Sequence, residues 1–420
     1  MPRTDGNAAQ AAAKVAGESL AQGGVSAAFG LAGALFGAMA AGAAAGVAAE
    51  RFAVRRRRRA SDPYADEPFG ALPYDSAQVV NADGVDLYVE IVEADGEPDL
   101  TVVFVHGFAL DMGTWHFQRR VFTGHEDPRV RMVFYDQPGH GHSGPRPDGD
   151  YTIDQLADSL AAVIAKVAPE GPLVLAGHSM GGMTLMALAE RHPDLVLDRV
   201  VGAALISTSA GHLDDVALGF PPIVAWMRGA LTPALSKVLR WQPTMAERGR
   251  RSGSDLAYLL TERYGFGSAN PSPALVEYVE HMNDGTKVEV LAGYLDTLSQ
   301  HDRYAALEAF ADIETLVVCG DRDMLTPVEH TREIAKLLPG AALLEIPDGG
   351  HCTLMEHADA TNAALAELFR RAAGVAAGQR PTAAAQRTEV AAAKKRRGWA
   401  RRSSAQQRRA LDRILRRKGV

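Results

Sequence analysis

Cysteine is scarce in this chain: its 420 residues include two, Cys319 and Cys352. Two cysteines supply neither the disulfide framework of a small secreted protein nor the ligands of a cysteine-based zinc site. The sequence therefore favours a reducing, cytoplasmic setting. No internal repeat is visible either. The 47% of apolar residues fits a globular protein that has one large core with an inserted element, or two smaller domains.

The overall charge of −7 hides an uneven distribution. Residues 1–60 carry a net charge of +5 and residues 380–420 carry +12, which leaves −24 on the residues between them. An acidic body argues against nucleic acid as a partner, because it would repel the phosphates. The two basic ends need a separate explanation.

The segment 25–49 contains no charged residue and is followed by the arginines at 55–59. Its length suits a membrane-spanning helix, and Gly33 and Gly37 are spaced for close helix pairing in lipid. The arginines would keep the rest of the chain on the cytoplasmic side of the membrane. Bulky apolar side chains are few in this segment, so an Ala/Gly-rich leader on a cytoplasmic protein is the alternative.

The tail from residue 374 onward is rich in alanine, glycine and glutamine, and further on in arginine and lysine. Within 404–418, Leu411, Ile414 and Leu415 share one side of a helical pattern that arginines surround. A basic amphipathic helix of this kind would bind an anionic membrane surface. A solvated, disordered charged tail is the alternative.

The body of the chain alternates short apolar runs with helical patterns, which predicts an α/β fold with a mostly parallel sheet covered by helices on both faces. From Gly211 to about Asp312 the strand rhythm stops, and helical patterns with several Trp and Tyr residues take its place. This stretch predicts a helical cap inserted over the edge of the sheet. The predicted strands are 77–80, 85–92, 101–105, 131–135, 173–176, 200–207, 315–319 and 342–346.

The strand at 173–176 leads directly into Gly177-His178-Ser179-Met180-Gly181, and a helical pattern follows. A G-x-S-x-G turn between a strand and a helix presents its serine on a strained backbone with the hydroxyl exposed. Side chains at Gly177 and Gly181 would collide with the neighbouring strand and helix. Ser179 is therefore a candidate nucleophile. An ordinary glycine-rich turn is the alternative interpretation of these five residues alone.

A serine nucleophile needs a base to take its proton and an acid to orient that base. On such a sheet both should follow the serine in the chain, in loops after later strands. His351 follows a late strand, and the small residues before it leave its imidazole room to reach Ser179. Asp323 is the candidate acid and Asp321 the second choice. A turn carboxylate that caps the next helix is the alternative role for Asp323.

The backbone N–H groups of Phe108 and Met180 are the expected donors to a tetrahedral oxyanion. Met180 follows the candidate nucleophile, and Phe108 lies in a His-Gly-Phe loop after another strand. The side chains of Phe108 and Met180 would also shape the substrate pocket, together with Trp115 and Met324. Packing beneath the loop is the alternative role for Trp115.

Over residues 77–371 these features resemble the α/β-hydrolase fold superfamily, in a serine esterase or lipase-like form that carries a helical cap. The motifs occur in the family's order, and His140 and His142 belong to a turn that is structural in the family rather than a metal site. The motifs are His106-Gly107, Asp136-x-Pro-Gly-His-Gly-x-Ser143, Gly177-His-Ser-Met-Gly-Gly182, Gly320-x-x-Asp323 and Gly350-His351.

The resemblance implies a serine hydrolase that cleaves small-molecule carboxylic esters through an acyl-enzyme on Ser179, Asp323 and His351, with no cofactor and no metal. Relatives with an aspartate nucleophile act on haloalkanes or epoxides, and Ser179 argues against both. The Ser-Met-Gly-Gly form also resembles esterases, monoacylglycerol lipases and cofactor-free haloperoxidases. Thioester hydrolysis, acyl transfer, perhydrolysis and C–C cleavage therefore stay open, as does a non-catalytic binding protein. Cap aromatics that line the pocket would favour apolar or lipid-like esters.

The expected organisation places the cap between two parts of one catalytic core. The expected segments are a flexible N-terminus at 1–24, a candidate membrane helix at 25–54, a basic stretch and linker at 55–76, core at 77–211, cap at 212–312, core at 313–373 and a basic tail at 374–420.

Overall fold

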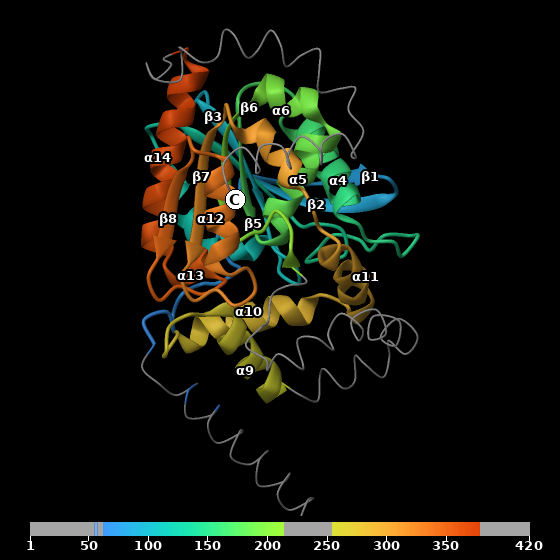
Figure 1. Cartoon of the computed structure of the whole chain (residues 1–420), viewed down its shortest axis with the longest axis vertical. Coiled ribbons are helices and arrows are strands. Elements are labelled where there is room, and N and C mark those ends of the chain that lie inside the picture. The colour runs from blue at the N-terminus through green and yellow to red at the C-terminus, as the bar shows by residue number, and fades with distance from the viewer. Residues whose placement is uncertain (1–53, 55–56, 58–61, 214–253, 379–420) are drawn as a thin grey trace, which may run out of the picture. The chain divides into compact units, whose positions relative to one another are not determined.

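The computed structural model of the protein describes residues 62–213 and 254–378, besides Val54 and Arg57 (Figure 1). The predicted membrane span at 25–49 and the predicted amphipathic helix at 404–418 lie outside the described residues. Within the ranges that are described, no helix combines the length and the apolar character needed to cross a bilayer.

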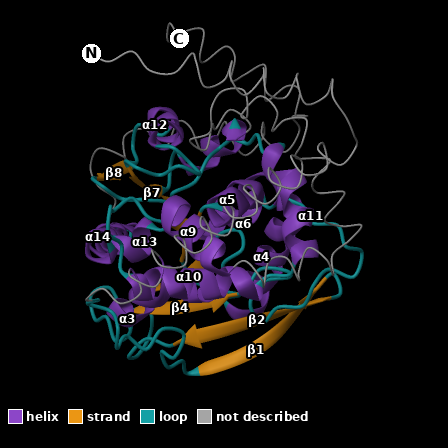
Figure 2. Cartoon of the chain, turned by 90° about the horizontal axis from the view of Figure 1, so that it is seen from below, coloured by secondary structure: helices purple, strands orange, loops and turns teal. Residues whose placement is uncertain are grey.

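An eight-stranded sheet forms the centre of the protein, with the strand order β1-β2-β4-β3-β5-β6-β7-β8. Strand β2 runs antiparallel to both of its neighbours, whereas the pairs from β4 to β8 are parallel. Figure 2 shows the strands from β1 and β2 at one edge to β7 and β8 at the other. The predicted α/β-hydrolase sheet is thereby confirmed. The strands are β1 Ser76–Ala82, β2 Val85–Val92, β3 Leu100–Val105, β4 Val130–Tyr135, β5 Leu173–His178, β6 Val200–Ile206, β7 Glu314–Gly320 and β8 Ala342–Ile346.

The register of the central strands brings their carboxyl ends together. Val105, at the end of β3, pairs with Tyr135 of β4 on one side and with Gly177 of β5 on the other. The loops that follow these three strands therefore leave the sheet at the same edge. Ligands of open α/β sheets bind at this edge.

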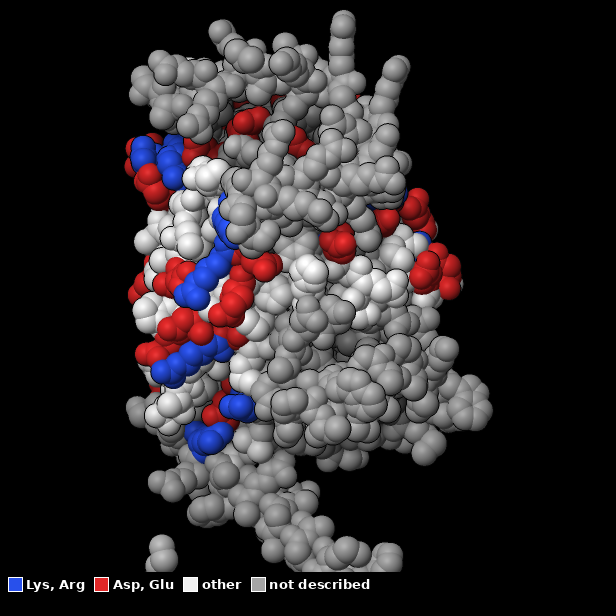
Figure 3. Space-filling view, viewed as in Figure 1, with Lys and Arg blue, Asp and Glu red and all other residues white. Residues whose placement is uncertain are grey.

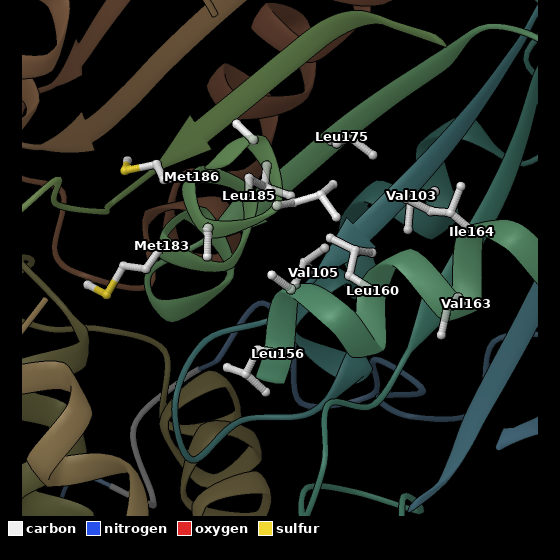
Figure 4. Close-up of a cluster of buried hydrophobic side chains, with 14 of the residues drawn as sticks. Val103, Val105, Leu156, Leu160, Val163, Ile164, Leu175, Met183, Leu185 and Met186 are labelled. Atoms are coloured by element: carbon white, nitrogen blue, oxygen red, sulfur yellow. The ribbon is translucent and has the colours of Figure 1, made fainter. Parts of the chain in front are cut away.

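Helices cover both faces of the sheet, as the alternating pattern predicts. One face carries α3 and α14, and the other carries α4, α5 and α12 (Figure 2). Figure 4 shows side chains of α4 and α5 gathered around Val103, Val105 and Leu175 of the sheet. The helices outside the insertion are η1 Met112–Trp115, α3 His116–Phe122, α4 Ile153–Val167, α5 Met180–Arg191, α6 Pro193–Arg199, α12 Val328–Leu337, α13 Thr353–Glu356 and α14 Ala358–Ala376.

The stretch between β6 and β7, called the insertion below, is mainly helical from residue 254 to residue 310. Its helices are α9 Ser254–Gly265, α10 Pro273–Gly285, α11 Val288–Ser299 and η3 Tyr304–Phe310. Tyr258, Met282 and Tyr294 of the predicted cap are buried in α9, α10 and α11. Trp226 and Trp241 also fall within the predicted cap at 212–312, but they lie outside the described residues.

The described part of the predicted linker, from residue 62, makes specific contacts with the insertion. The Asp62 carboxylate accepts hydrogen bonds from Ser272 Oγ at 2.7 Å and from the Ala274 N–H at 2.6 Å, at the start of α10. The Phe69 ring stacks on Tyr278 with ring centres 4.5 Å apart. This segment therefore packs against the body as part of it.

Charged side chains of both signs lie next to one another on the described surface. Figure 3 shows blue and red groups interleaved along the left side of this face, where α14 and β8 lie in Figure 1. Ion pairs include Arg332 of α12 with Glu345 of β8 at 2.6 Å, and Arg370 with Glu367 within α14 at 2.5 Å. Exposed pairs of this kind contribute little to stability.

Candidate active site

Ser179 occupies the turn between β5 and α5 in a conformation that few non-glycine residues adopt, with φ 53° and ψ −119°. A Cβ atom on Gly177 would lie 2.6 Å from the backbone nitrogen of Gly182, and one on Gly181 would overlap the carbonyl oxygen of Val105. The turn can therefore be this tight because both positions lack a side chain. The strain is held by packing of the sheet against α5.

Three predicted residues meet at the carboxyl edge of the sheet. His351 Nε2 lies 2.9 Å from Ser179 Oγ, and His351 Nδ1 lies 2.9 Å from one carboxylate oxygen of Asp323 and 3.1 Å from the other. His351 and Asp323 are buried, whereas Ser179 is partly exposed. Such a chain of hydrogen bonds can move a proton from a hydroxyl to an imidazole and stabilise the resulting imidazolium.

Asp323 is held as a carboxylate by its surroundings. Burial alone would raise its pKa, but the neighbouring His351 and hydrogen bonds from Thr326 outweigh burial and hold the pKa of Asp323 below its usual value. Thr326 donates through both its N–H and its hydroxyl, each at 2.9 Å, and the Leu325 N–H donates at 2.9 Å. Asp323 therefore closes the turn before α12 and contacts His351 at the same time. Asp321, the second choice, is exposed.

His178 was not singled out from the sequence, although it precedes Ser179. Its Nε2 lies 3.0 Å from the carbonyl oxygen of His351, and the two rings are 5.0 Å apart. Complete burial, with His351 nearby, lowers the pKa of His178 to about 3. His178 is therefore neutral at pH 7 and donates one hydrogen bond from Nε2. A histidine inside the G-x-S-x-G turn was the only sequence signal for this role.

The loop after β3 is held in place by the turn after β4. The Ala109 N–H donates to His140 Nε2 at 3.2 Å, and the Met112 N–H donates to a carboxylate oxygen of Asp136 at 2.8 Å. Burial lowers the pKa of His140 to about 3, which keeps this acceptor nitrogen unprotonated. Ala109 lies in this loop and has a φ of 61°.

The backbone N–H groups of Phe108 and Met180 are the expected oxyanion donors. Among the described residues, neither of them donates a hydrogen bond to a protein acceptor.

The four predicted pocket residues have different surroundings. Phe108 and Met324 are partly exposed, and the Phe108 ring lies 6.5 Å from that of Tyr294 in the insertion. Met180 is fully buried behind Ser179. Trp115 is also fully buried and contacts Phe104 of β3, with ring centres 5.0 Å apart. In the part of the chain that the structure describes, no group of three or more His, Cys, Asp or Glu residues could hold a metal ion.

Comparison with known proteins identifies the family of this chain. The sequence model of the family described as alpha/beta hydrolase fold matches residues 101–358. The chain is 29% identical over 274 residues to a non-heme chloroperoxidase of Kitasatospora aureofaciens, an alignment that covers 64% of this chain and 92% of the relative. It is 28% identical over 247 residues to a pimeloyl-[acyl-carrier protein] methyl ester esterase of Yersinia pseudotuberculosis, covering 59% and 82%.

A solved structure of an esterase is also similar to this chain. The thermophilic esterase from Thermogutta terrifontis superposes with a TM-score of 0.53 at 25% identity, over 71% of this chain and 99% of that enzyme. The fold, the strand order and the family match together support a hydrolase. The chain belongs to the alpha/beta hydrolase fold family.

Proposed function

We propose that this protein is a serine hydrolase that cleaves carboxylic esters through an acyl-enzyme on Ser179. The observation that carries the proposal is the chain of hydrogen bonds from Ser179 through His351 to Asp323. A hydroxyl at pH 7 is a weak nucleophile, and an imidazole 2.9 Å away can accept its proton as the oxygen attacks.

In the acylation step, Ser179 Oγ forms a bond to the ester carbonyl carbon while its proton passes to His351 Nε2. The carbonyl oxygen becomes an oxyanion, for which the N–H groups of Phe108 and Met180 are the proposed donors. Their freedom from other protein acceptors among the described residues supports this role. The C–O bond to the alcohol then breaks, and His351 returns the proton to the leaving oxygen. Asp323 stays ionised throughout.

Deacylation repeats these steps with water. His351 takes a proton from the water as its oxygen bonds to the acyl carbon, and the bond to Ser179 Oγ breaks as the proton returns to that oxygen. The carboxylic acid leaves and the serine is restored. Each oxyanion donor is expected to lower the barrier by about 3 kcal/mol.

We further propose that the substrates are apolar or lipid-like esters. The aromatic pair of Phe108 and Tyr294 beside the oxyanion loop supports an apolar acyl or alcohol portion. The basic residues of 380–420 would hold the enzyme at an anionic membrane surface, where lipid esters are concentrated. Equal hydrolysis of short water-soluble and long-chain esters would contradict this substrate class.

A second candidate function is perhydrolysis, which the non-heme chloroperoxidase relative supports. The acyl-enzyme would form in the same way, and hydrogen peroxide would replace water as the acceptor of the acyl group. The product would then be a peracid. Peracid formation from a short carboxylic ester and hydrogen peroxide, measured beside ester hydrolysis, distinguishes the two functions.

The deciding experiment compares hydrolysis of short-chain to long-chain p-nitrophenyl esters by the wild type, Ser179→Ala and Ser76→Ala. Ser76 is exposed at the start of β1, so its variant controls for the loss of a serine hydroxyl. The proposal expects kcat/KM to fall at least about 10⁴-fold in Ser179→Ala and to be unchanged in Ser76→Ala. Wild-type protein that is folded but neither hydrolyses any ester nor reacts with a fluorophosphonate would favour a non-catalytic binding protein instead.

A further inference from the structure

Glu356, at the end of α13, binds two segments that are far apart in the chain. Its Oε2 accepts a hydrogen bond from the Gly350 N–H at 2.8 Å, next to His351. Its Oε1 accepts from the Ser268 N–H at 2.8 Å, in the insertion just after α9. The Gly267 N–H lies 3.1 Å from Oε1 and 3.0 Å from Oε2. One carboxylate thus satisfies three backbone donors.

The two segments that Glu356 joins are Gly265–Ser268 of the insertion and the loop Pro347–Cys352, called the His351 loop. They touch through their backbones. The Cys352 N–H donates to the Gly265 carbonyl oxygen at 2.7 Å. A Cβ on Gly267 would lie 2.5 Å from the Asp348 carbonyl oxygen, and one on Gly350 would overlap the backbone of Phe266.

Backbone contact this close leaves no room for a side chain to fill the junction. The N–H groups that face it must find an acceptor, because an unpaired buried donor is costly. A carboxylate suits the position because it has two acceptor oxygens, no proton to donate, and a charge that strengthens each hydrogen bond. From the other side, Arg322 Nη1 donates to the Gly267 carbonyl oxygen at 3.1 Å and also pairs with Asp348.

We propose that Glu356 is a positioning residue for His351, and that it fastens the insertion and the His351 loop into one unit. The inference rests on the proposed function, in which His351 is the base. Glu356 touches neither Ser179 nor Asp323 in the described hydrogen bonds, so it would act through the backbone of Gly350. A displacement of Gly265–Ser268 would remove two of its three donors and loosen the loop that sets the distance from His351 to Ser179.

The substitution Glu356→Gln tests this with little change in shape. The carboxamide offers one oxygen, and its NH₂ group would face backbone N–H groups that also donate. Glu356→Asp keeps the charge but shortens the side chain, so it should fall between the wild type and Glu356→Gln. Glu367→Gln is the matched control, because Glu367 lies on α14, away from the site, and pairs with the exposed Arg370.

Two measurements report on His351 rather than on the substrate pocket. One is the rate at which a small fluorophosphonate labels Ser179, per folded molecule. The other is the low-field proton resonance of the hydrogen bond between His351 Nδ1 and Asp323. For Glu356→Gln we expect labelling to slow by roughly 10- to 100-fold, because small misplacements of reacting groups have effects of this size. The low-field resonance should shift or broaden, and Glu367→Gln should match the wild type in both.

Either of two outcomes would overturn the inference. One is wild-type labelling and an unchanged resonance in Glu356→Gln. The other is a loss of activity that follows only the fraction of unfolded protein, with full reactivity in what remains folded. If Glu356→Gln cannot be purified folded, the same comparison between Glu356→Asp and the wild type decides. Failure of the wild type itself to react with the probe would contradict the proposed function rather than the role of Glu356.

Discussion

The Nε2 atom of His178 lies 3.0 Å from the carbonyl oxygen of His351, so the turn that carries Ser179 is bonded directly to the loop opposite it. This bond is separate from the one between Ser179 and His351. It fixes the backbone of the His351 loop, whereas the bond to Asp323 fixes the orientation of the ring. Two kinds of constraint therefore act on His351.

The bond from His178 can be tested by a pair of substitutions. Glutamine at this position can place an amide donor near the original Nε2, whereas leucine cannot. We expect His178→Leu to lower kcat by about tenfold through a misplaced His351. The unpaired carbonyl should also lower the free energy of unfolding by about 1–3 kcal/mol. His178→Gln should retain most of the wild-type kcat and most of the wild-type stability. A folded His178→Leu with the kcat of the wild type would contradict this role.

Replacement of Asp323 by asparagine should disturb the tautomer and orientation of His351 while it leaves the fold intact. An amide beside His351 Nδ1 favours the wrong tautomer, so kcat should fall by about 10⁴-fold in steady-state ester hydrolysis. The hydrogen bonds from Thr326 and Leu325 can still reach an oxygen, which should preserve the turn. Activity within tenfold of the wild type would exclude Asp323 as the acid and would favour Asp321 instead.

The same substitution predicts a change in acid stability. The pKa of Asp323 is lowered in the folded protein, so its contribution to stability is present above the unfolded value of about 3.9 and is lost as the pH falls through the folded value. The difference in unfolding free energy between wild type and Asp323→Asn should therefore shrink below about pH 4. Urea unfolding across this range measures it. A difference that stays constant with pH would contradict the lowered pKa.

His301 predicts a second pH dependence of stability. Its Nε2 lies 3.0 Å from the Ser209 carbonyl oxygen, and burial lowers its pKa to about 3. Between this value and the unfolded value of about 6.5, the unfolded chain binds a proton that the folded protein does not. Stability should therefore fall as the pH is lowered through this range, by about 1.4 kcal/mol per pH unit for each such histidine.

The variant His301→Gln keeps a donor for Ser209 but cannot titrate. Its unfolding free energy should decline less steeply than that of the wild type below about pH 6.5. The two proteins should have the same slope at higher pH. Parallel declines throughout the acid range would show that His301 does not contribute.

Glycine at position 181 should be irreplaceable for the fold, since an added Cβ would overlap the Val105 carbonyl oxygen in the sheet. We expect Gly181→Ala to lower the free energy of unfolding by about 3 kcal/mol or more, because backbone on both sides must move. Gly285→Ala, at the end of α10 with open space around it, should change stability by less than about 1 kcal/mol. Thermal unfolding of both variants provides the comparison.

Much of the fold could be predicted from local patterns. The strands expected at 77–80 and 85–92 are β1 and β2, and the turn between them contains Asp83 and Gly84 with positive φ values of 50° and 78°. Parallel strands that are covered on both faces have no solvent-facing side. Continuous apolar runs in the sequence therefore identify them. Ser179, Asp323 and His351 could be named because turn motifs mark the ends of the strands that carry them.

No sequence pattern identifies the other parts of the site. Glu356 is one of many glutamates, and its three donors come from Gly267, Ser268 and Gly350. Backbone donors carry no side-chain pattern in the sequence. The role of His178 depends likewise on a carbonyl group of a distant loop.

By itself the sequence determined the order of strands and helices, the serine turn and the candidate triad, because hydrophobic periodicity and turn residues act over short stretches. Only the tertiary structure decided between Asp323 and Asp321 as the neighbour of His351, since both follow β7 and differ in burial and in the direction of the side chain. It alone brought the insertion against the His351 loop. Contacts between distant segments depend on how the sheet and the helices pack and so orient their backbone groups. No local sequence pattern predicts that orientation.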